Sequence, residues 1–378
     1  MSRRGNGEGS IYRDGDRWIG ALYVRDHLGR TVKRKFTGRS RKEVAARLAA
    51  AKEAADRHLP VGDPKLTTGA FLDQWLRDSA APALRPRTHE SYAMIVRVHL
   101  KPAIGHIPLL KLSPADVQAY MASKRADGLS ARTTQYHHSV LRRALHIAEA
   151  WGAVPRNVAR LATPPRVERG EVSPFTPEQA RSFLQAVRGD RLAALYTVAI
   201  VMGLRQGELL GLRWDDVDFE RTALSIRHTL QKVGGEFQLA ETKTAKSRRT
   251  LAMPAPVVAA LRSHRSRQAE ERLWLGPAWQ GEAMGLVFTD EAGDPMSDSR
   301  LRKAFARIVK EAGLPKQRFH DLRHAAATYM LTQGVPLRVA MEVLGHSQIH
   351  VTANTYSHVM PELKREAAER VGGLLFGS

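Results

Sequence analysis

A proline-rich, charged segment without hydrophobic periodicity, RNVARLATPPRVERGEVSP at residues 156–174, most constrains how this chain can fold. Such a stretch lacks the regularly spaced apolar residues with which a helix or strand packs against a core. We therefore interpret residues 156–173 as a linker between two folded parts. A chain of 378 residues is long enough for two or three domains, so a break of this kind is expected.

The part of the chain before this linker contains a second, shorter linker, HLPVGDPK at residues 58–65. Ahead of it, residues 8–37 alternate apolar and polar side chains and include an Asp-Gly turn, a pattern that predicts short β-strands. The sequence SRKE at residues 40–43 is a capping box before an alanine-rich helix. Residues 1–57 are therefore expected to form a small sheet with one helix.

Residues 66–155 are expected to form an all-helical bundle. Large apolar side chains such as Phe71 and Trp75 recur there at helical spacing. A Ser-Pro pair at residues 113–114 predicts the start of one helix, and Ser130 predicts the start of a longer one.

Residues 174–378 combine helical patterns with a group of short strands. TPEQ at residues 176–179 predicts a helix start, and the apolar residues 190–203 predict a buried helix. The stretch 221–254 predicts three strands with a Gly-Gly turn. The expected fold class is thus multidomain: a small sheet with a helix, an all-α bundle, and a mixed α+β, mainly helical part with a small antiparallel sheet and a C-terminal tail helix.

The charge of the chain points to a polyanionic partner. The formal net charge is +21 and the isoelectric point is about 10.6, and the positive excess is densest before residue 167. Such a field favours nucleic acid. A solubilising surface, an arginine-rich codon usage and an acidic membrane surface are the alternatives.

Cysteine is absent, which excludes disulfides, thiolate zinc sites and thiol nucleophiles and fits a reducing compartment. The first residues lack the apolar run of a secretory signal. The longest apolar run, residues 192–204, is too short to span a bilayer. We expect a cytoplasmic protein without a membrane partner.

Six polar residues stand out in the last part of the chain as one chemical set. They are two arginines, two histidines, a lysine and a tyrosine, namely Arg205, Lys243, His320, Arg323, His346 and Tyr356. Guanidinium groups match the two non-bridging oxygens of a phosphodiester and stay charged. A tyrosine hydroxyl titrates near about 10, so it needs a base or a cationic field to act as a nucleophile. A histidine can take its proton, and a lysine can protonate a departing alkoxide.

Taken singly, each of these residues also has an ordinary structural interpretation. Arg205 could be a helix-terminus residue, with Glu208 as its salt-bridge partner one turn later. Tyr356 could be a packing residue, and Lys246 competes with Lys243 in the same basic hairpin. The argument depends on the set and on its order.

That order resembles the motifs of the tyrosine recombinases, specifically phage and mobile-element integrases of the lambda-integrase type. The family order Arg, Lys, His-x-x-Arg, His, Tyr is matched by GLRQGELLGLRW, KTAKSRRTL, FHDLRH, LGHS and NTYSHV. Ala325 stands where the family often has Thr or Ser, a small departure. The resemblance covers essentially the whole chain and implies an arm-type DNA-binding domain at 1–57, a helical core-binding domain at 66–155 and a catalytic domain at 174–378.

The resemblance implies a site-specific recombinase that cleaves and rejoins DNA through a covalent 3′-phosphotyrosyl intermediate. Tyr356 would attack the phosphate, and Lys243 would protonate the leaving 5′ oxygen. His320 would serve as the base for the tyrosine or as a further phosphate ligand, and Glu208 would orient the Arg205 region. The phosphate oxygens would be bound by Arg205, Arg323 and His346. No metal, cofactor or ATP is expected, because the covalent bond conserves the phosphodiester energy.

The resemblance also implies partners. These are double-stranded attachment-site DNA, a homo-tetramer on synapsed DNA, and an accessory excisionase or a host DNA-bending protein, all at the nucleoid. We expect the first domain to bind separate arm sites through Trp18, Lys33, Arg34 and Lys35, although Trp18 could equally belong to the core. The tail PELKREAAERVGGLLF has an apolar face that would dock on a neighbouring protomer; intramolecular packing is the alternative.

Three other functions use some of the same residues. The sequence HDLRH places His320 and His324 four residues apart, as in a zinc protease helix, but with Asp where the general base is Glu. A type IB topoisomerase shares the strand-nicking chemistry without partner exchange. A non-catalytic DNA-binding protein could keep the fold alone.

Overall fold

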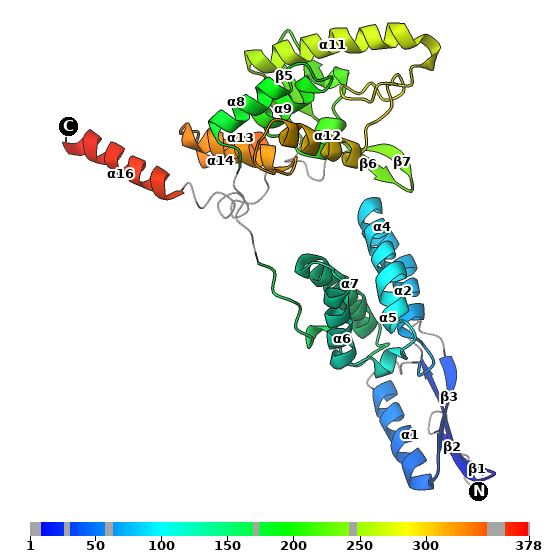
Figure 1. Cartoon of the computed structure of the whole chain (residues 1–378). Helices are drawn as coiled ribbons and strands as arrows, with labels where there is room; N and C mark the ends of the chain where they lie inside the picture. The colour runs from blue at the N-terminus through cyan, green and yellow to red at the C-terminus, as the bar shows by residue number, and fades with distance from the viewer. Residues whose placement is uncertain are drawn as a thin grey trace. The chain divides into compact units, whose positions relative to one another are not determined.

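The computed structural model of the chain describes residues 9–25, 31–56, 63–168, 174–241, 248–345 and 360–376. The chain divides into two units, residues 1–169 and 170–378 (Figure 1). Each unit has its own hydrophobic core, so each is described by itself.

The first unit begins with a three-stranded antiparallel sheet covered by one helix. Its elements are β1 (Ser10–Asp14), β2 (Arg17–Arg25), β3 (Thr31–Gly38) and α1 (Arg41–Asp56), with strand order β1-β2-β3. Ser40 caps α1, because its side-chain oxygen accepts the N–H of Glu43 at 3.1 Å. Glu43 accepts the N–H of Arg39 and not that of Ser40, so only half of the predicted capping box forms as expected. Leu22 and Val24 of β2 pack against Leu48 of α1.

The rest of the first unit is an all-helical bundle, as expected. Its elements are α2 (Thr68–Trp75), η1 (Leu76–Ala80), α3 (Ala81–Ala83), α4 (Pro86–Ile95), η2 (Val96–Leu100), α5 (Lys101–Ile104), η3 (Leu109–Lys111), α6 (Pro114–Ala126), α7 (Ala131–Ala150) and η4 (Val158–Arg160). Ser113 and Ser130 cap α6 and α7 through their side-chain oxygens, as the sequence predicts.

The beginning of the segment that we interpreted as a linker packs on this bundle. Ala159 and Ala162 are buried in its core, and the carbonyl of Ala159 lies 2.7 Å from Nε2 of His138. Small residues near two prolines can therefore extend the bundle without the periodicity that a helix requires.

The second unit is mainly helical and surrounds the buried helix α9. Its elements are α8 (Pro177–Ala186), α9 (Ala193–Met202), α10 (Gln206–Leu210), η5 (Trp214–Asp216), β4 (Val217–Asp218), β5 (Ala223–Ile226), β6 (His228–Val233), β7 (Glu236–Glu241), β8 (Arg249–Ala252), α11 (Ala255–Leu275), η7 (Gly276–Ala278), α12 (Asp298–Glu311), α13 (Asp321–Thr332), α14 (Leu337–Leu344) and α16 (Met360–Phe376). Helices α11, α13 and α8 all contact α9.

The prediction of three strands between residues 221 and 254 was wrong. The first of them is two strands, β5 and β6, which separate at Arg227 into different sheets, β4-β5-β8 and β6-β7. Strand β6 packs against α10. Gly211 allows this close approach, because a Cβ at Gly211 would lie 2.6 Å from the backbone nitrogen of Leu230. This long-range contact bends the chain at a point where the sequence alone reads as one continuous strand.

A search of the described helices for one long and apolar enough to cross a bilayer found none.

Candidate functional site

Four of the predicted site residues of the second unit lie in the described chain: Arg205, Glu208, His320 and Arg323. Lys243, its rival Lys246, His346 and Tyr356 lie outside the described residues. Of the predicted site, the structure thus describes the two arginines, Glu208, the first histidine and the elements that hold them.

Arg205 is placed by the sharp turn between α9 and α10. Helix α9 ends at Gly203, whose φ of +63° is the left-handed conformation that favours glycine. A Cβ at Gly203 would also lie 2.6 Å from the Leu344 side chain, so only glycine fits there. Two residues later, Arg205 stands immediately before the first residue of α10.

Glu208 fixes both the backbone and the guanidinium of Arg205. Its Oε2 accepts the Arg205 backbone N–H at 3.1 Å, and its Oε1 accepts Nη1 of the same residue at 2.6 Å. Nη2 of Arg205 donates to the carbonyl of Gly345 at 2.5 Å. The side chain of Arg205 nevertheless remains 38% exposed, so it can still be reached from solvent.

The pKa of Glu208 is lowered despite its burial. Burial alone would raise this pKa, but the charges and hydrogen bonds of Arg249 and Arg205 outweigh it. The carboxylate, 4% exposed, is therefore ionised at neutral pH and serves as a fixed negative support between two arginines.

Arg323 lies in the first turn of α13 and is buried, with 2% of its surface exposed. Its Nη1 donates to the carbonyl of Gly203 and its Nη2 to that of Leu344, each at 2.7 Å. Arg205 and Arg323 thus bind the carbonyls of two consecutive residues, Gly345 and Leu344, at the end of α14.

A third arginine, which the sequence analysis missed, binds the same helix end. Arg249, the first residue of β8, donates through Nε to the carbonyl of Val343 at 2.7 Å and through Nη2 to Oε2 of Glu208 at 3.0 Å. The carbonyls of three consecutive residues, 343 to 345, are therefore held by three arginines from three different segments. The double arginine before TLAMP was visible in the sequence, but nothing local distinguished Arg249 from Arg248.

His320 stands at the start of α13, where its ring meets that of His324 edge-to-face, with 5.1 Å between the ring centroids. Partial burial of the ring, together with the positive surroundings of His324 and Arg323, lowers the pKa of His320 to about 4. Although His320 as a whole residue is exposed, a pKa below the ordinary histidine value leaves its imidazole neutral at physiological pH. A neutral imidazole can accept a proton or donate one N–H to a phosphate oxygen.

Asp321 argues against the zinc-protease interpretation of HDLRH. Its two carboxylate oxygens bind Arg318, through Nη2 at 2.7 Å and the backbone N–H at 2.8 Å. These bonds lower the pKa of Asp321 against the opposing effect of burial. The carboxylate of Asp321 is therefore engaged by Arg318, which precedes α13, and is not free to act as a general base between the two histidines.

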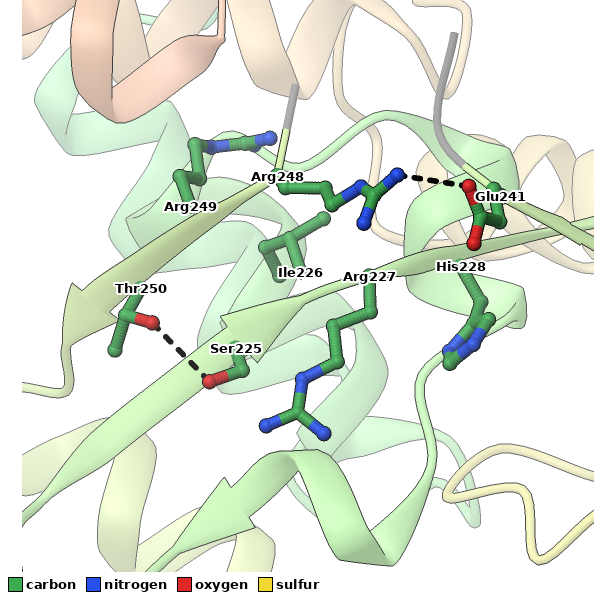
Figure 2. A pocket seen from close by; sticks show the side chains of 8 residues that line it. All are labelled: Ser225, Ile226, Arg227, His228, Glu241, Arg248, Arg249 and Thr250. Carbon is green, nitrogen blue, oxygen red and sulfur yellow. Dashed lines mark hydrogen bonds and ion pairs between the residues drawn. The ribbon is translucent and has the colours of Figure 1, made fainter. Parts of the chain in front are cut away.

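An open cavity of about 530 Å³ is lined by residues 225–228 of the β5–β6 segment, by Glu241 at the end of β7 and by residues 248–250 (Figure 2). Figure 2 shows Arg248, at the start of the returning chain, directed toward Glu241, the last residue of β7; the two are 2.8 Å apart. This exposed ion pair lies beside Arg249 in the chain. Because Arg248 and Glu241 are both exposed, this ion pair contributes little stability.

In the first unit, the structure separates the four residues that we expected on one DNA-binding face. Lys33 and Lys35 are exposed, and Tyr23, opposite Lys33 in the register, is 65% exposed. Alternation along the strands puts Arg34 and Trp18 on the other face, toward α1. Arg34 is bound there to Asp63 at 2.9 Å, and Trp18 is only partly exposed. We therefore leave Arg34 and Trp18 out of the DNA-binding face.

The second unit thus contains a cluster of fixed guanidinium groups with a neutral imidazole near one of them. Such a cluster can bind an anion with two accessible oxygens and stabilise additional negative charge on it. This is the requirement for chemistry at a phosphodiester.

Comparisons with known proteins agree with this interpretation. Residues 174–362 match the model of the phage integrase family, and residues 67–124 match that of the phage integrase N-terminal SAM-like domain. A tyrosine recombinase XerC-like protein of Caldanaerobacter subterraneus is 31% identical over 367 residues, which cover 93% of this chain and 94% of the relative. An integrase of Streptomyces ambofaciens is 31% identical over 370 residues, covering 94% of this chain and 93% of the relative.

Solved structures share the fold. The Tn1549 transposon integrase, in complex with a circular intermediate DNA, superposes with a TM-score of 0.69 at 22% identity, over 81% of this chain and 100% of that one. A lambda integrase tetramer bound to a Holliday junction gives 0.58 at 18% identity, over 94% and 96%. The expected fold class is confirmed.

The chain belongs to the phage integrase family. Within it, this protein is an integrase of the tyrosine recombinase type, an enzyme that recombines DNA at specific sites by breaking and rejoining strands. The resemblance drawn from the motifs is confirmed, and the topoisomerase and non-catalytic alternatives are not favoured.

Proposed function

We propose that the active site of this recombinase forms around the C-terminal end of α14, with Tyr356 as the nucleophile. The observation that carries this proposal is the convergence of Arg205 and Arg323 on the carbonyls of Gly345 and Leu344. Gly345 directly precedes His346 in the chain. The second histidine therefore follows, in sequence, the two carbonyls that the proposed phosphate-binding arginines hold. Tyr356 follows ten residues later.

The proposed reaction proceeds in two balanced steps. In the first, the Tyr356 oxygen attacks the scissile phosphorus, its proton passes to a base such as His320, and the 5′ oxygen leaves with a proton from Lys243 or Lys246. This gives a 3′-phosphotyrosyl bond and a free 5′-hydroxyl. In the second, a 5′-hydroxyl from the partner duplex attacks the same phosphorus and gives its proton to the lysine that lost one, while Tyr356 departs and takes back its proton from the base. The number of phosphodiester bonds is unchanged, so no external energy source enters the balance.

The phosphate ligands are proposed as Arg205, Arg323 and His346. Arg205 is accessible, whereas Arg323 is buried. A direct phosphate contact by Arg323 therefore requires the residues that cover it to move when DNA binds. The neutral form of His320 supports its role as a proton acceptor, because a protonated ring could not take the tyrosine proton.

We propose a division of DNA contacts among three parts. Residues 1–57 bind arm sites, residues 66–155 bind the core site and residues 174–378 carry the chemistry, with linkers at 58–65 and 156–173. The exposed face with Tyr23, Lys33 and Lys35 supports the first assignment, because aromatic and cationic side chains suit a nucleic-acid surface. The partners are double-stranded attachment-site DNA and, for directionality, an excisionase or a host DNA-bending protein at the nucleoid in the cytoplasm.

We propose that the working form is a homo-tetramer on two synapsed duplexes. The lambda integrase relative has been solved as a tetramer on a Holliday junction. In this chain, the end of α16 exposes Leu374, Leu375 and Phe376, with Leu374 83% exposed. Apolar side chains left in solvent favour docking on another protomer.

The experiment that tests the nucleophile is the substitution Tyr356→Phe. This variant should form no covalent protein–DNA adduct and yield no recombinants, while its salt-dependent DNA binding stays within about threefold of wild type. Lys243→Ala and Lys246→Ala, compared on the same DNA, identify the general acid as the one with the slower cleavage. An adduct that persists in Tyr356→Phe would refute the assignment.

A further inference from the structure

We propose that Arg249 is a positioning residue for strand cleavage, which aligns Arg205 and the end of α14 without touching the DNA. The inference rests on the phosphate-binding roles proposed above for Arg205 and Arg323. Arg249 was not among the residues that the motif order singled out.

Arg249 and Arg205 share the carboxylate of Glu208. Oε1 of Glu208 accepts from Arg205 at 2.6 Å, and Oε2 accepts from Arg249 at 3.0 Å. Oε2 also accepts the backbone N–H of Arg205. Rotation of the Glu208 carboxylate would therefore move the Arg205 guanidinium, and Arg249 prevents that rotation from the opposite side.

Arg249 and Arg323 also bind adjacent carbonyls at the C-terminal end of α14. Arg249 binds the carbonyl of Val343, and Arg323 binds that of Leu344. The last carbonyls of a helix lack intrahelical partners and carry the negative end of its dipole, so cations are favoured there. The three arginines and the helix end thus form one unit in which each position depends on the others.

Gly345 fits tightly against the guanidinium groups of Arg249 and Arg205. A Cβ at this residue would lie 2.8 Å from Nη1 of Arg249 and 3.5 Å from Nη1 of Arg205. The backbone of Gly345 is therefore in contact with both guanidiniums. Gly345, the residue at which α14 ends, is thus in direct contact with Arg249.

Burial separates Arg249 from its neighbour Arg248. The side chain of Arg249 is 8% exposed, which leaves little of it available to DNA. Arg248 is 58% exposed and pairs with Glu241, which is also exposed. A role in positioning is thus expected for Arg249 and not for Arg248, although the two are adjacent in sequence and carry the same charge.

The test measures single-turnover cleavage of a nicked substrate at saturating protein, together with the dissociation constant for the same DNA. Arg249→Ala should slow cleavage by about 100-fold, comparable to the loss of a fixed donor at a charged transition state, with the dissociation constant changed by less than about threefold. Arg249→Lys keeps the charge but not the fork, so cleavage should be intermediate, about tenfold slower than wild type.

Two matched controls separate positioning from stability. Arg248→Ala removes the neighbouring arginine, and Arg191→Ala removes a partly buried arginine that binds Glu271 at 2.6 Å elsewhere in the same unit. Both should cleave within about threefold of wild type at a temperature well below their melting temperatures. If Arg191→Ala and Arg249→Ala slow cleavage equally after equal losses of melting temperature, Arg249 is only structural and the proposal fails.

The decisive comparison is the double variant Arg205→Lys with Arg249→Ala. If Arg249 acts through Arg205, the second substitution should slow the Arg205→Lys enzyme by less than about tenfold, far below its effect on wild type. Fully multiplicative effects would overturn the proposal. If Arg205→Lys itself cleaves at the wild-type rate, the proposed phosphate-binding role is wrong, which is a different failure from a normal rate in Arg249→Ala alone. Should Arg249→Ala fail to fold, Arg249→Lys in the same two backgrounds gives the same comparison.

Discussion

At the scale of single residues, the site depends on charged groups whose positions are fixed by more than one bond. Arg205 is held by two oxygens of Glu208 and by the Gly345 carbonyl. A group fixed in this way before the substrate arrives does not have to be reoriented during the reaction, which is why such sites stabilise charge efficiently. The geometry of the fork is therefore as important as its charge.

Arg205→Lys is expected to slow cleavage by about 100-fold, because an ammonium group cannot bind Glu208, Gly345 and a phosphate oxygen in one plane. DNA affinity should change little, since most of it comes from other phosphate contacts. Single-turnover cleavage and a binding titration check the two parts. Arg213→Lys is the control, because Arg213 binds Met284 and Asp215 away from this site. Near-normal cleavage by Arg205→Lys would contradict the account.

The lowered pKa of His320 predicts a small pH-dependent contribution to stability, small because the residue as a whole is exposed. The ordinary histidine pKa is about 6.5, and in the folded protein it is about 4, so the unfolded chain binds the proton more readily between these values. The stability contributed by neutral His320 is therefore complete above about pH 6.5 and is lost as the pH falls toward 4. The free energy of unfolding of His320→Gln should fall less steeply than that of wild type across this range. Parallel denaturation curves from pH 7 to pH 4.5 would refute the shift.

At the scale of elements, the C-terminal end of α14 is the common support of the site. Segments from the α9–α10 turn, β8 and α13 all meet there through arginine side chains. Helix starts in this unit follow ordinary rules: Thr176 caps α8 with Gln179, and Ser297 caps α12 by accepting the N–H of Arg300. Local sequence signals determine where these helices begin, whereas the arginine contacts at the end of α14 join segments that are distant in the chain.

Gly345→Ala is expected to be among the most damaging small substitutions. Gly345 has φ of +68°, which strains any other residue, and the added carbon would collide with Arg249. Cleavage should fall by at least 100-fold, with a loss of melting temperature of several degrees. Gly234→Ala, with a similar φ of +60° but open space around it, is the matched control and should cost stability without a comparable loss of cleavage. Equal cleavage by the two variants would show that the contact with Arg249 is unimportant.

Much of this element structure could be predicted from sequence because its signals are local. The capping residues Ser40, Ser113, Ser130 and Thr176 are confirmed. Arg249 could not be identified, because its partners Glu208 and Val343 are 41 and 94 residues away in the chain. The placement of Arg34 is different: alternation between Lys33 and Lys35 already indicated the opposite face of the strand, and that signal was overlooked.

At the scale of the whole molecule, the chain contains separate folded parts, to which we assign separate DNA-binding tasks as a proposal. The first unit has its own sheet core and its own bundle core, and the second has a core around α9. Parts of this kind can be removed one at a time. The positive charge, densest in the first part, predicts strong salt dependence of DNA binding.

Removing the ends of the chain should separate the tasks. A protein that begins at residue 66 should still cleave core-site DNA within about tenfold of the full chain but lose the ability to bridge distal arm sites. A protein that lacks residues 361–378 should bind single sites normally and assemble synaptic complexes poorly. Gel-shift assays with one-site and two-site DNA measure both effects. Loss of core-site binding in the first protein, or an equal loss of both activities in the second, would contradict this division.

The most direct measurement of the central claim is to incubate the protein with a nicked DNA that traps the cleaved strand, digest the product and identify the residue bonded to the 3′ phosphate by mass spectrometry. The account predicts a single phosphotyrosyl peptide containing Tyr356. An adduct on any other residue, or rejoined DNA from a protein that never forms an adduct, would contradict it.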